Sequence, residues 1–203
     1  MLRFIIIGLV IWGLIAAEKK ANREQDSIPL PAQVVATDHI RGSDTAPVTL
    51  VEYGDFQCPA CATYHPIVEQ LVADFGSSTL RFVFRHFPLT QHANAMPSAQ
   101  ASEAAGVQGK FWEMYDILYE KQGEWENAKD AKIIFVGYAK SLGLDEKKFS
   151  DDFELQELKD KINDDYKSGL KAKINSTPTF FLNGKQITNP RNYDEFKKLK
   201  AEI

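Results

Sequence analysis

The chain has 203 residues, enough for one domain of ordinary size with a substantial core. Its hydrophobic fraction of 44% and charged fraction of 26% are typical of a soluble globular chain once the N-terminus is set aside. The net charge is −4, and no block of Lys and Arg supplies a local basic field. Composition and charge therefore argue against nucleic-acid binding.

The N-terminus differs from the rest of the chain. Arg3 precedes an uncharged apolar run over 4–17. This run is short for a membrane-spanning helix, which needs about 20 residues, and it resembles the apolar region of a secretory signal. Cleavage after residue 17 would place Ile15 where a small residue is wanted. We therefore expect 1–20 to be an uncleaved signal anchor or, alternatively, a cleaved signal peptide. A core helix of a cytosolic domain is the third interpretation, although such a helix normally shows a polar face.

Both favoured interpretations place the bulk of the chain on the extracytoplasmic side of a membrane, in the periplasm or at the cell exterior. Residues 21–45 show no sustained period and are interpreted as a linker, with a short strand near Gln33 to Ala36. The domain itself is expected to cover 46–203.

A strand, a helix and a second strand are predicted at the start of this domain. Pro47 to Tyr53 is rich in β-branched and aromatic residues, which favours a buried strand. Pro59 to Phe75 carries apolar residues at helical spacing, and Leu80 to Phe87 alternates as a strand does. This order predicts a βαβ unit with two parallel strands.

The remainder is mostly helical until a hairpin near the end. Amphipathic segments at about 93–107, 109–121, 128–142 and 153–172 predict four helices. Asn183-Gly184 lies between two β-prone runs and predicts a β-hairpin, and Tyr193 to Ile203 predicts a final helix. The fold class is therefore α/β: a small mixed sheet with a helical insertion over about 92–173.

Cys58 and Cys61 are the only cysteines, and they form a C-x-x-C motif between a strand and a helix. A disulfide that closes so short a loop contributes little to stability, so the pair favours chemistry over scaffolding. Backbone N–H groups at a helix N-terminus stabilise a thiolate. We expect Cys58 to be the exposed nucleophile and Cys61, one turn inside, to resolve the mixed disulfide.

Three other interpretations of the cysteines remain open. They are a static structural disulfide, an inert packing pair, and a zinc site in which His65 joins the two cysteines without an identifiable fourth ligand. We expect His65, His86 and His92 to be surface or structural residues rather than to act directly.

Several phrases together resemble the thioredoxin fold. They are VEYGDFQCPAC, Pro66 five residues after Cys61, and TPTFFLNG. The helical block, with its phrase GKFWEMYDILYE, resembles the DsbA-like branch of disulfide-bond-forming proteins within that fold. The resemblance runs from about Ala46 to the C-terminus.

The resemblance implies roles for three further residues. Pro178 matches the cis-proline that faces the cysteine pair, and Thr177 would offer its backbone to an extended substrate. An ordinary trans proline at a strand start is the alternative. Glu52 matches the buried acid behind the cysteines, which would have a raised pKa and carry the proton of Cys61; a solvent-facing glutamate is the alternative. No metal and no cofactor are implied.

The expected function is a protein disulfide oxidase that acts on thiols of folding secreted proteins and is reoxidised by a membrane redox partner. Strongly oxidising members often carry His where this chain has Ala60, so we expect a less oxidising potential. A disulfide isomerase or reductase using the same site is the first alternative. A monomer is expected, because 18–45 is too short for the dimerisation domain of an isomerase. The second alternative is a membrane-tethered binding or chaperone module with a structural disulfide.

Overall fold

The computed structural model of the protein describes residues 33–199. The predicted signal anchor or signal peptide (1–20), the first part of the predicted linker and the last four residues lie outside this range. Across 33–199, every helix is too short or too polar to cross a membrane.

A five-stranded sheet has the order β1-β3-β2-β4-β5. β2 (Val48–Gly54) and β3 (Leu80–His86) are parallel, which confirms the predicted βαβ unit. β1 (His39–Arg41) pairs antiparallel with β3 on one side. β4 (Thr179–Leu182) pairs antiparallel with β2 on the other side, and β5 (Lys185–Gln186) completes the edge. The predicted α/β fold class is confirmed.

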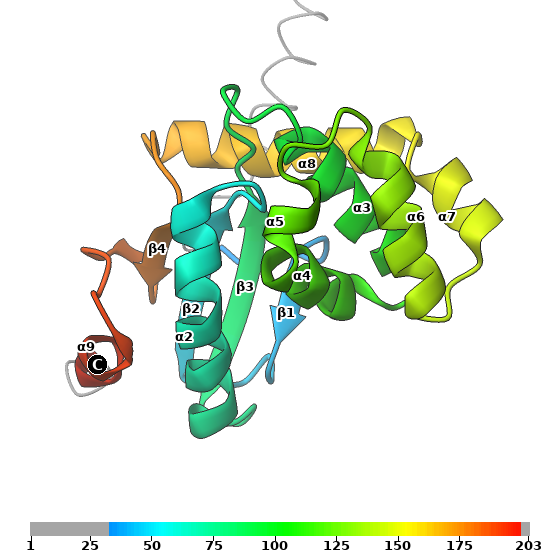
Figure 1. The fold of residues 1–203 in the computed structure, drawn as a ribbon. Coiled ribbons are helices and arrows are strands. Elements are labelled where there is room, and N and C mark those ends of the chain that lie inside the picture. The colour runs from blue at the N-terminus through cyan, green and yellow to red at the C-terminus, as the bar shows by residue number, and fades with distance from the viewer. Residues whose placement is uncertain (1–32, 200–203) are drawn as a thin grey trace, which may run out of the picture.

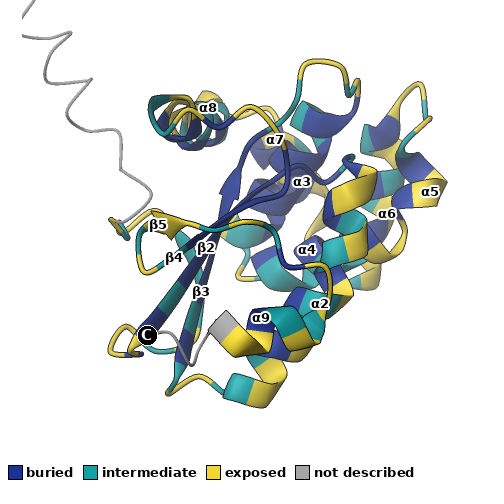
Figure 2. Cartoon of the chain, turned by 90° about the vertical axis from the view of Figure 1, so that its left-hand side faces the viewer, coloured by how far each residue is buried: buried dark blue, intermediate teal, exposed yellow. Residues whose placement is uncertain are grey.

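Helices cover both faces of the sheet (Figures 1 and 2). α2 (Pro59–Phe75) and α9 (Tyr193–Leu199) lie on one face, and α8 (Gln156–Lys171) lies on the other. The inserted helices gather beside α2 (Figure 1): α3 (Ala95–Val107), α4 (Phe111–Glu120), α5 (Gln122–Trp125), α6 (Ala131–Ser141) and α7 (Glu146–Asp152).

Alternation along β2 divides the core into two parts. Leu50 packs with Phe82 and Phe84 on the α2 face, whereas Val51 and Tyr53 pack on the α8 face. Successive side chains of a strand point to opposite faces, so Glu52 shares the α2 face with Leu50. An ionisable residue is thereby placed in the larger apolar cluster.

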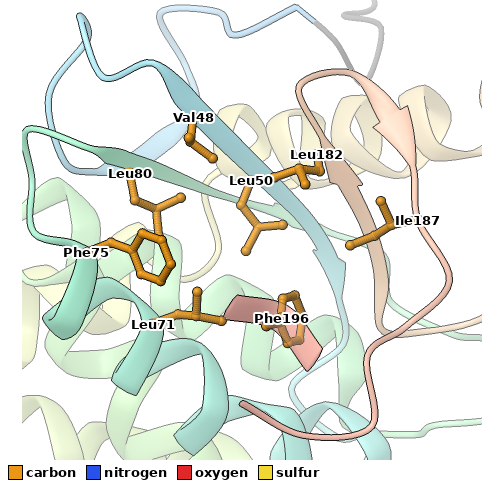
Figure 3. Close-up of a pocket in the computed structure, with 8 residues that line it drawn as sticks. All are labelled: Val48, Leu50, Leu71, Phe75, Leu80, Leu182, Ile187 and Phe196. Carbon is orange, nitrogen blue, oxygen red and sulfur yellow. The ribbon is translucent and has the colours of Figure 1, made fainter. Parts of the chain in front are cut away.

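A small apolar recess of about 20 Å³ lies between the sheet, α2 and α9 (Figure 3). Its walls include Val48, Leu71 and Phe196, whose side chains converge in the close-up. Val48 begins β2, whereas Cys58 follows the end of that strand. The recess therefore lies at the end of the sheet away from the cysteines and belongs to core packing.

Two predicted boundaries are wrong. No strand forms near Gln33 to Ala36: the chain turns at Ala36 and Thr37, where the Asp38 side chain accepts from the backbone N–H of Val35 at 2.8 Å. The strand follows at His39–Arg41, so the sheet begins inside the range interpreted as a linker. The helix predicted over 153–172 begins only at Gln156, because the chain leaves α7 at Phe153 and buries that ring against Phe149.

The predicted hairpin is confirmed at Asn183 and Gly184. Both residues have positive φ, 45° and 79°, as a tight two-residue turn between strands requires. Two short helices, α5 and α7, were not predicted as separate elements.

Candidate active site

Cys58 is the N-cap of α2, directly after the loop that follows β2. Its backbone N–H donates to the carbonyl of Asp55 at 3.0 Å, and its own carbonyl accepts from Ala62 at 3.1 Å. Pro59 occupies the first turn, where its missing N–H is of no consequence. The sulfur therefore lies at the positive end of the helix, as the motif predicted.

The cysteines are both free thiols, and both are buried. Cys61 has no exposed surface, in agreement with its predicted place inside the helix. Cys58 is only 6% exposed, so the prediction of an exposed nucleophile is wrong. The cause is the segment before β4, where the carbonyl oxygen of Thr177 lies 3.4 Å from the Cys58 sulfur.

The peptide bond between Thr177 and Pro178 is cis, so the alternative of an ordinary trans proline is wrong. Asn189 donates to the carbonyl of Pro178 at 2.7 Å and fixes this turn from the other side. A hollow beside the turn is lined by polar uncharged and apolar residues: Ser176, Pro178, Thr179, Gln186, Ile187, Thr188 and Asn189. An extended chain could therefore lie against Thr177 next to the cysteines.

The two thiols differ strongly in acidity. A hydrogen bond from Cys61, together with Thr177 and the backbone N–H groups of Cys61 and Ala60, lowers the pKa of Cys58 to about 5, against the opposing effect of burial. Burial, followed by the interaction with Cys58, raises the pKa of Cys61 well above its ordinary value. Near neutral pH Cys58 is therefore a thiolate and Cys61 a thiol.

Glu52 lies on β2 between Phe84 of β3 and Phe180 of β4 and is 1% exposed. The alternative of a solvent-facing glutamate is therefore wrong. Burial, and then the negative charges of Cys58 and Glu69, raise the pKa of Glu52 to about 8. The Glu52 carboxyl also contributes to the raised pKa of Cys61, which places the two groups within electrostatic reach.

A set of side-chain amides ties the cysteine loop to the helical insertion, and sequence reasoning missed it. Gln122 of α5 donates to the carbonyls of Phe56 at 2.6 Å and Cys58 at 3.2 Å. Gln57 donates to the carbonyl of Glu126 at 2.7 Å. No motif marks these residues, because each contact joins segments more than sixty positions apart in the chain.

Asp55 is a second group that sequence reasoning missed. This carboxylate is 2% exposed and accepts from the backbone N–H groups of Gln57 at 2.8 Å and Leu89 at 3.0 Å. It also pairs with His92 at 2.6 Å. Asp55 thereby joins the loop before Cys58 to the loop after β3.

The other histidines are also paired. Nε2 of His86 lies 2.8 Å from Glu103, and Nε2 of His65 lies 3.1 Å from Asp116. Within 33–199, the cysteines belong to no group of three potential metal ligands; the group that does occur joins His65, Glu69 and Asp116. Arg41 already forms ion pairs with both carboxylates of that group. The zinc interpretation of the cysteines therefore has no support in the geometry.

The fold and the cysteine site define a class, the thioredoxin-fold proteins with a helical insertion. The model of a thioredoxin family matches residues 35–200. The chain belongs to the DsbA-like thioredoxin-fold family.

Solved structures agree with this assignment. BdbD of Bacillus subtilis, in its oxidised form, is 26% identical with a TM-score of 0.72, over 81% of this chain and 91% of that one. The alpha-DsbA1 protein of Wolbachia pipientis has the same fold, with 20% identity and a TM-score of 0.73 over 84% and 92% of the two chains.

A longer relative carries a similar segment. The protein named Na+/H+ antiporter NhaA 1 of Salinispora arenicola is 43% identical over 150 residues, which are 73% of this chain and 22% of that protein. The chain thus spans less than a quarter of the length of this relative.

Proposed function

We propose that the protein is an extracytoplasmic protein disulfide oxidoreductase that exchanges a Cys58–Cys61 disulfide with thiols of secreted proteins, acting as an oxidase. The observation that carries the proposal is the difference between the two thiols. Cys58, at the N-terminus of α2, has a pKa of about 5, whereas Cys61 is fully buried and has a raised pKa. A stable thiolate is a good leaving group, so it favours transfer of the disulfide to substrate.

The exchange has two steps. A substrate thiolate attacks the Cys58 sulfur, the Cys58–Cys61 bond breaks, and a mixed disulfide forms between substrate and Cys58. Cys61 leaves as a thiolate and takes a proton from Glu52. A second thiolate of the substrate then attacks the substrate sulfur that is bonded to Cys58. The mixed disulfide breaks, a disulfide forms within the substrate, and the Cys58 thiolate is released. Two electrons pass from the substrate to the cysteine pair, and a membrane redox partner removes them again.

The segment at Thr177 and Pro178 has the role of holding the substrate in this proposal. Its backbone lies beside the Cys58 sulfur, and the hollow next to Pro178 continues away from it. An extended substrate segment pairs there with the Thr177 backbone, which places a substrate cysteine next to Cys58. Cysteines and protein groups supply the whole reaction, so the proposal includes no metal or cofactor.

The direction of electron flow is tested by the reduction potential, measured by equilibration against glutathione. A value near about −120 mV supports a strong oxidase, and one near about −270 mV supports a reductase instead. Because Ala60 leaves one source of thiolate stabilisation unused, we expect a value between these limits. The Cys58→Ser variant is the control and also tests the alternative of a binding module: loss of disulfide transfer with folding and substrate holding intact excludes a merely structural disulfide.

A second candidate follows from the similarity to a segment of proteins named as antiporters. In this candidate the chain serves a membrane ion transporter as its redox module rather than secreted proteins in general. The Cys61→Ser variant distinguishes the two, because a mixed disulfide that its Cys58 thiolate forms by attacking a partner's disulfide can no longer be resolved by Cys61. Mass spectrometry of the trapped complexes then identifies either a range of secreted proteins or a transporter.

A further inference from the structure

Three polar atoms behind the cysteine pair are buried without a hydrogen-bond partner. They are Oε2 of Glu52 and the hydroxyls of Tyr115 and Tyr119; among the residues that the structure describes, the Thr177 hydroxyl is the fourth such atom and belongs to the segment that covers Cys58. Buried polar groups are nearly always hydrogen-bonded, so each exception requires an explanation. Two such hydroxyls on which the charge of Glu52 acts, the proton carrier of the proposed reaction, point to a common purpose.

The two tyrosines lie one turn apart on α4 and face the cysteine loop. Their ring centroids are 5.0 Å apart, and they lie 5.7 Å and 5.0 Å from the ring of Phe56, which precedes Cys58 by two residues. The charge of Glu52 acts on both hydroxyls, and that of Cys61 acts on Tyr119. The hydroxyls therefore lie within electrostatic reach of the groups that exchange the proton.

His65 continues this line toward the surface. It follows Cys61 by one turn on α2, and its ring lies 5.4 Å from that of Tyr115 and 5.2 Å from that of Tyr119. Its Nε2 lies 3.1 Å from Asp116, whose side chain is 32% exposed, whereas that of His65 is 8% exposed. The polar groups thus extend from a fully buried carboxyl to one that meets solvent.

The remaining charged groups at this outer end are also paired. Arg41 donates to Asp116 at 2.8 Å and to Glu69, so one guanidinium pairs with both carboxylates of this group and offsets one of their two charges. The inner end holds Glu52 and the two cysteines.

The reaction requires such a route. When Cys61 leaves the disulfide it takes the proton of Glu52, and when the pair is reoxidised Cys61 returns a proton to Glu52. Because Glu52 has a pKa of about 8 in the protein with free thiols, it is mostly protonated at neutral pH once the exchange is complete. The carboxyl must therefore gain or lose a proton to solvent in every half-cycle, yet it is only 1% exposed.

We propose that Tyr115, Tyr119 and His65 form a proton path that connects Glu52 with solvent at Asp116. The path rests on the proposed function, since it serves the proton that Cys61 exchanges. Because the hydroxyls have no hydrogen-bond partner in the protein, the path requires water between them. Each hydroxyl accepts a proton from a bridging water on one lone pair and releases its own to the next, so neither needs to ionise. These residues are positioning and relay groups, and none of them touches the substrate.

The test compares Tyr115→Phe, Tyr119→Phe and the double variant with wild type and with Tyr138→Phe. Tyr138 is a matched control, because its hydroxyl bonds Glu124 in the insertion, away from the cysteines. The readout is the single-turnover rate at which Cys61 resolves a mixed disulfide of Cys58 with a model peptide, followed from pH 6 to 9. We expect the double variant to be slower by about tenfold or more, since positioned proton transfer contributes about 10²–10⁴-fold.

Two further readouts distinguish a relay from a structural role. The variants should be as stable as wild type or more stable, because the hydroxyls removed have no partner in the protein. Their reduction potential should be unchanged, because a path alters the rate of proton movement and not its end states. A slower rate accompanied by a shifted potential would instead indicate a disturbed site.

His65→Gln provides an independent arm should a tyrosine variant fail to fold. Glutamine keeps a donor for Asp116 but lacks the ring that exchanges protons, so the same slowing is expected. Wild-type resolution rates in both His65→Gln and Tyr119→Phe across the pH range would overturn the proposed path. The rate at which iodoacetamide alkylates Cys58 separates failure of the path from failure of the proposed function. If only the path is wrong, this alkylation rate is high in wild type and in every variant. If Cys58 is not a reactive thiolate, the alkylation rate is already low in wild type.

Discussion

The Cys58 sulfur lies 3.4 Å from the carbonyl oxygen of Thr177, although the two residues are 119 positions apart in the chain. Pairing of β2 with β4 brings them together, because Cys58 follows the first strand and Thr177 precedes the second. The carbonyl that covers the sulfur belongs to the backbone that would pair with a substrate. The nucleophile is therefore sheltered in the free protein by the same segment that is proposed to present the substrate to it.

The acidity of Cys58 is the most direct quantity to measure. Thiolate absorbance near 240 nm in the reduced protein should rise with a midpoint at about pH 5, because hydrogen bonds from Cys61 and the neighbouring groups favour the charged form. The Cys58→Ser variant should show no transition in this range, because the pKa of Cys61 is raised. A midpoint near the ordinary value of 9.0 would contradict the proposed chemistry.

The same shift affects stability in a defined direction. Between about pH 5 and 9 the unfolded chain binds a proton at Cys58 that the folded protein does not, so this group adds stability as pH rises. The gain is lost as pH falls through 5. Urea unfolding of reduced wild type and Cys58→Ser checks this at pH 5 and pH 8. The free energy of unfolding of wild type, relative to that of the variant, should be larger at pH 8 than at pH 5.

The contribution of Glu52 to stability should have the opposite pH dependence, and comparison with the Glu52→Gln variant tests it. The pKa of Glu52 is raised from 4.5 to about 8 by burial, so the folded protein keeps a proton that the unfolded chain has lost in this range. Wild type should therefore lose stability relative to Glu52→Gln as pH rises from about 4.5 to 8, by a few kcal/mol at most. If the difference in free energy of unfolding between the two proteins is the same at pH 5 and pH 7.5, Glu52 is not buried in solution.

Local patterns predicted the parts of this site that depend on neighbouring residues. The place of Cys58 at a helix N-terminus and the turn at Asn183-Gly184 depend on a few adjacent residues and are confirmed. The burial of Cys58 was predicted wrongly because the covering Thr177 arrives through strand pairing. Gln122 was missed for the same reason: its partners lie in a loop 64 and 66 positions away.

Gln122→Ala tests whether the helical insertion fixes the cysteine loop. Gln122 is buried and donates to two carbonyls of that loop, so truncation leaves both without this donor. We expect the free energy of unfolding to fall by about 1–3 kcal/mol. Hydrogen exchange should also become faster at the first turn of α2.

The matched control is Gln156→Ala, because Gln156 is exposed and its amide bonds only the neighbouring Asp160. It should change stability by less than about 0.5 kcal/mol. Equal losses in the two variants would mean that the contacts of Gln122 with the cysteine loop contribute nothing of their own.

Ala60→His tests how the residue between the cysteines sets the oxidising strength. Ala60 is exposed in the first turn of α2, and its backbone N–H helps to lower the pKa of Cys58. An imidazolium at this position adds a positive charge beside the thiolate and stabilises the reduced form. The reduction potential should therefore rise, by on the order of 30 mV if the charge contributes about 1.4 kcal/mol.

Ala73→His, on an exposed position near the other end of α2, is the matched control and should leave the potential unchanged. The difference should shrink above about pH 6.5, where the added histidine loses its charge; a potential that does not respond at pH 5.5 would mean that the thiolate is already stabilised as far as this helix end allows.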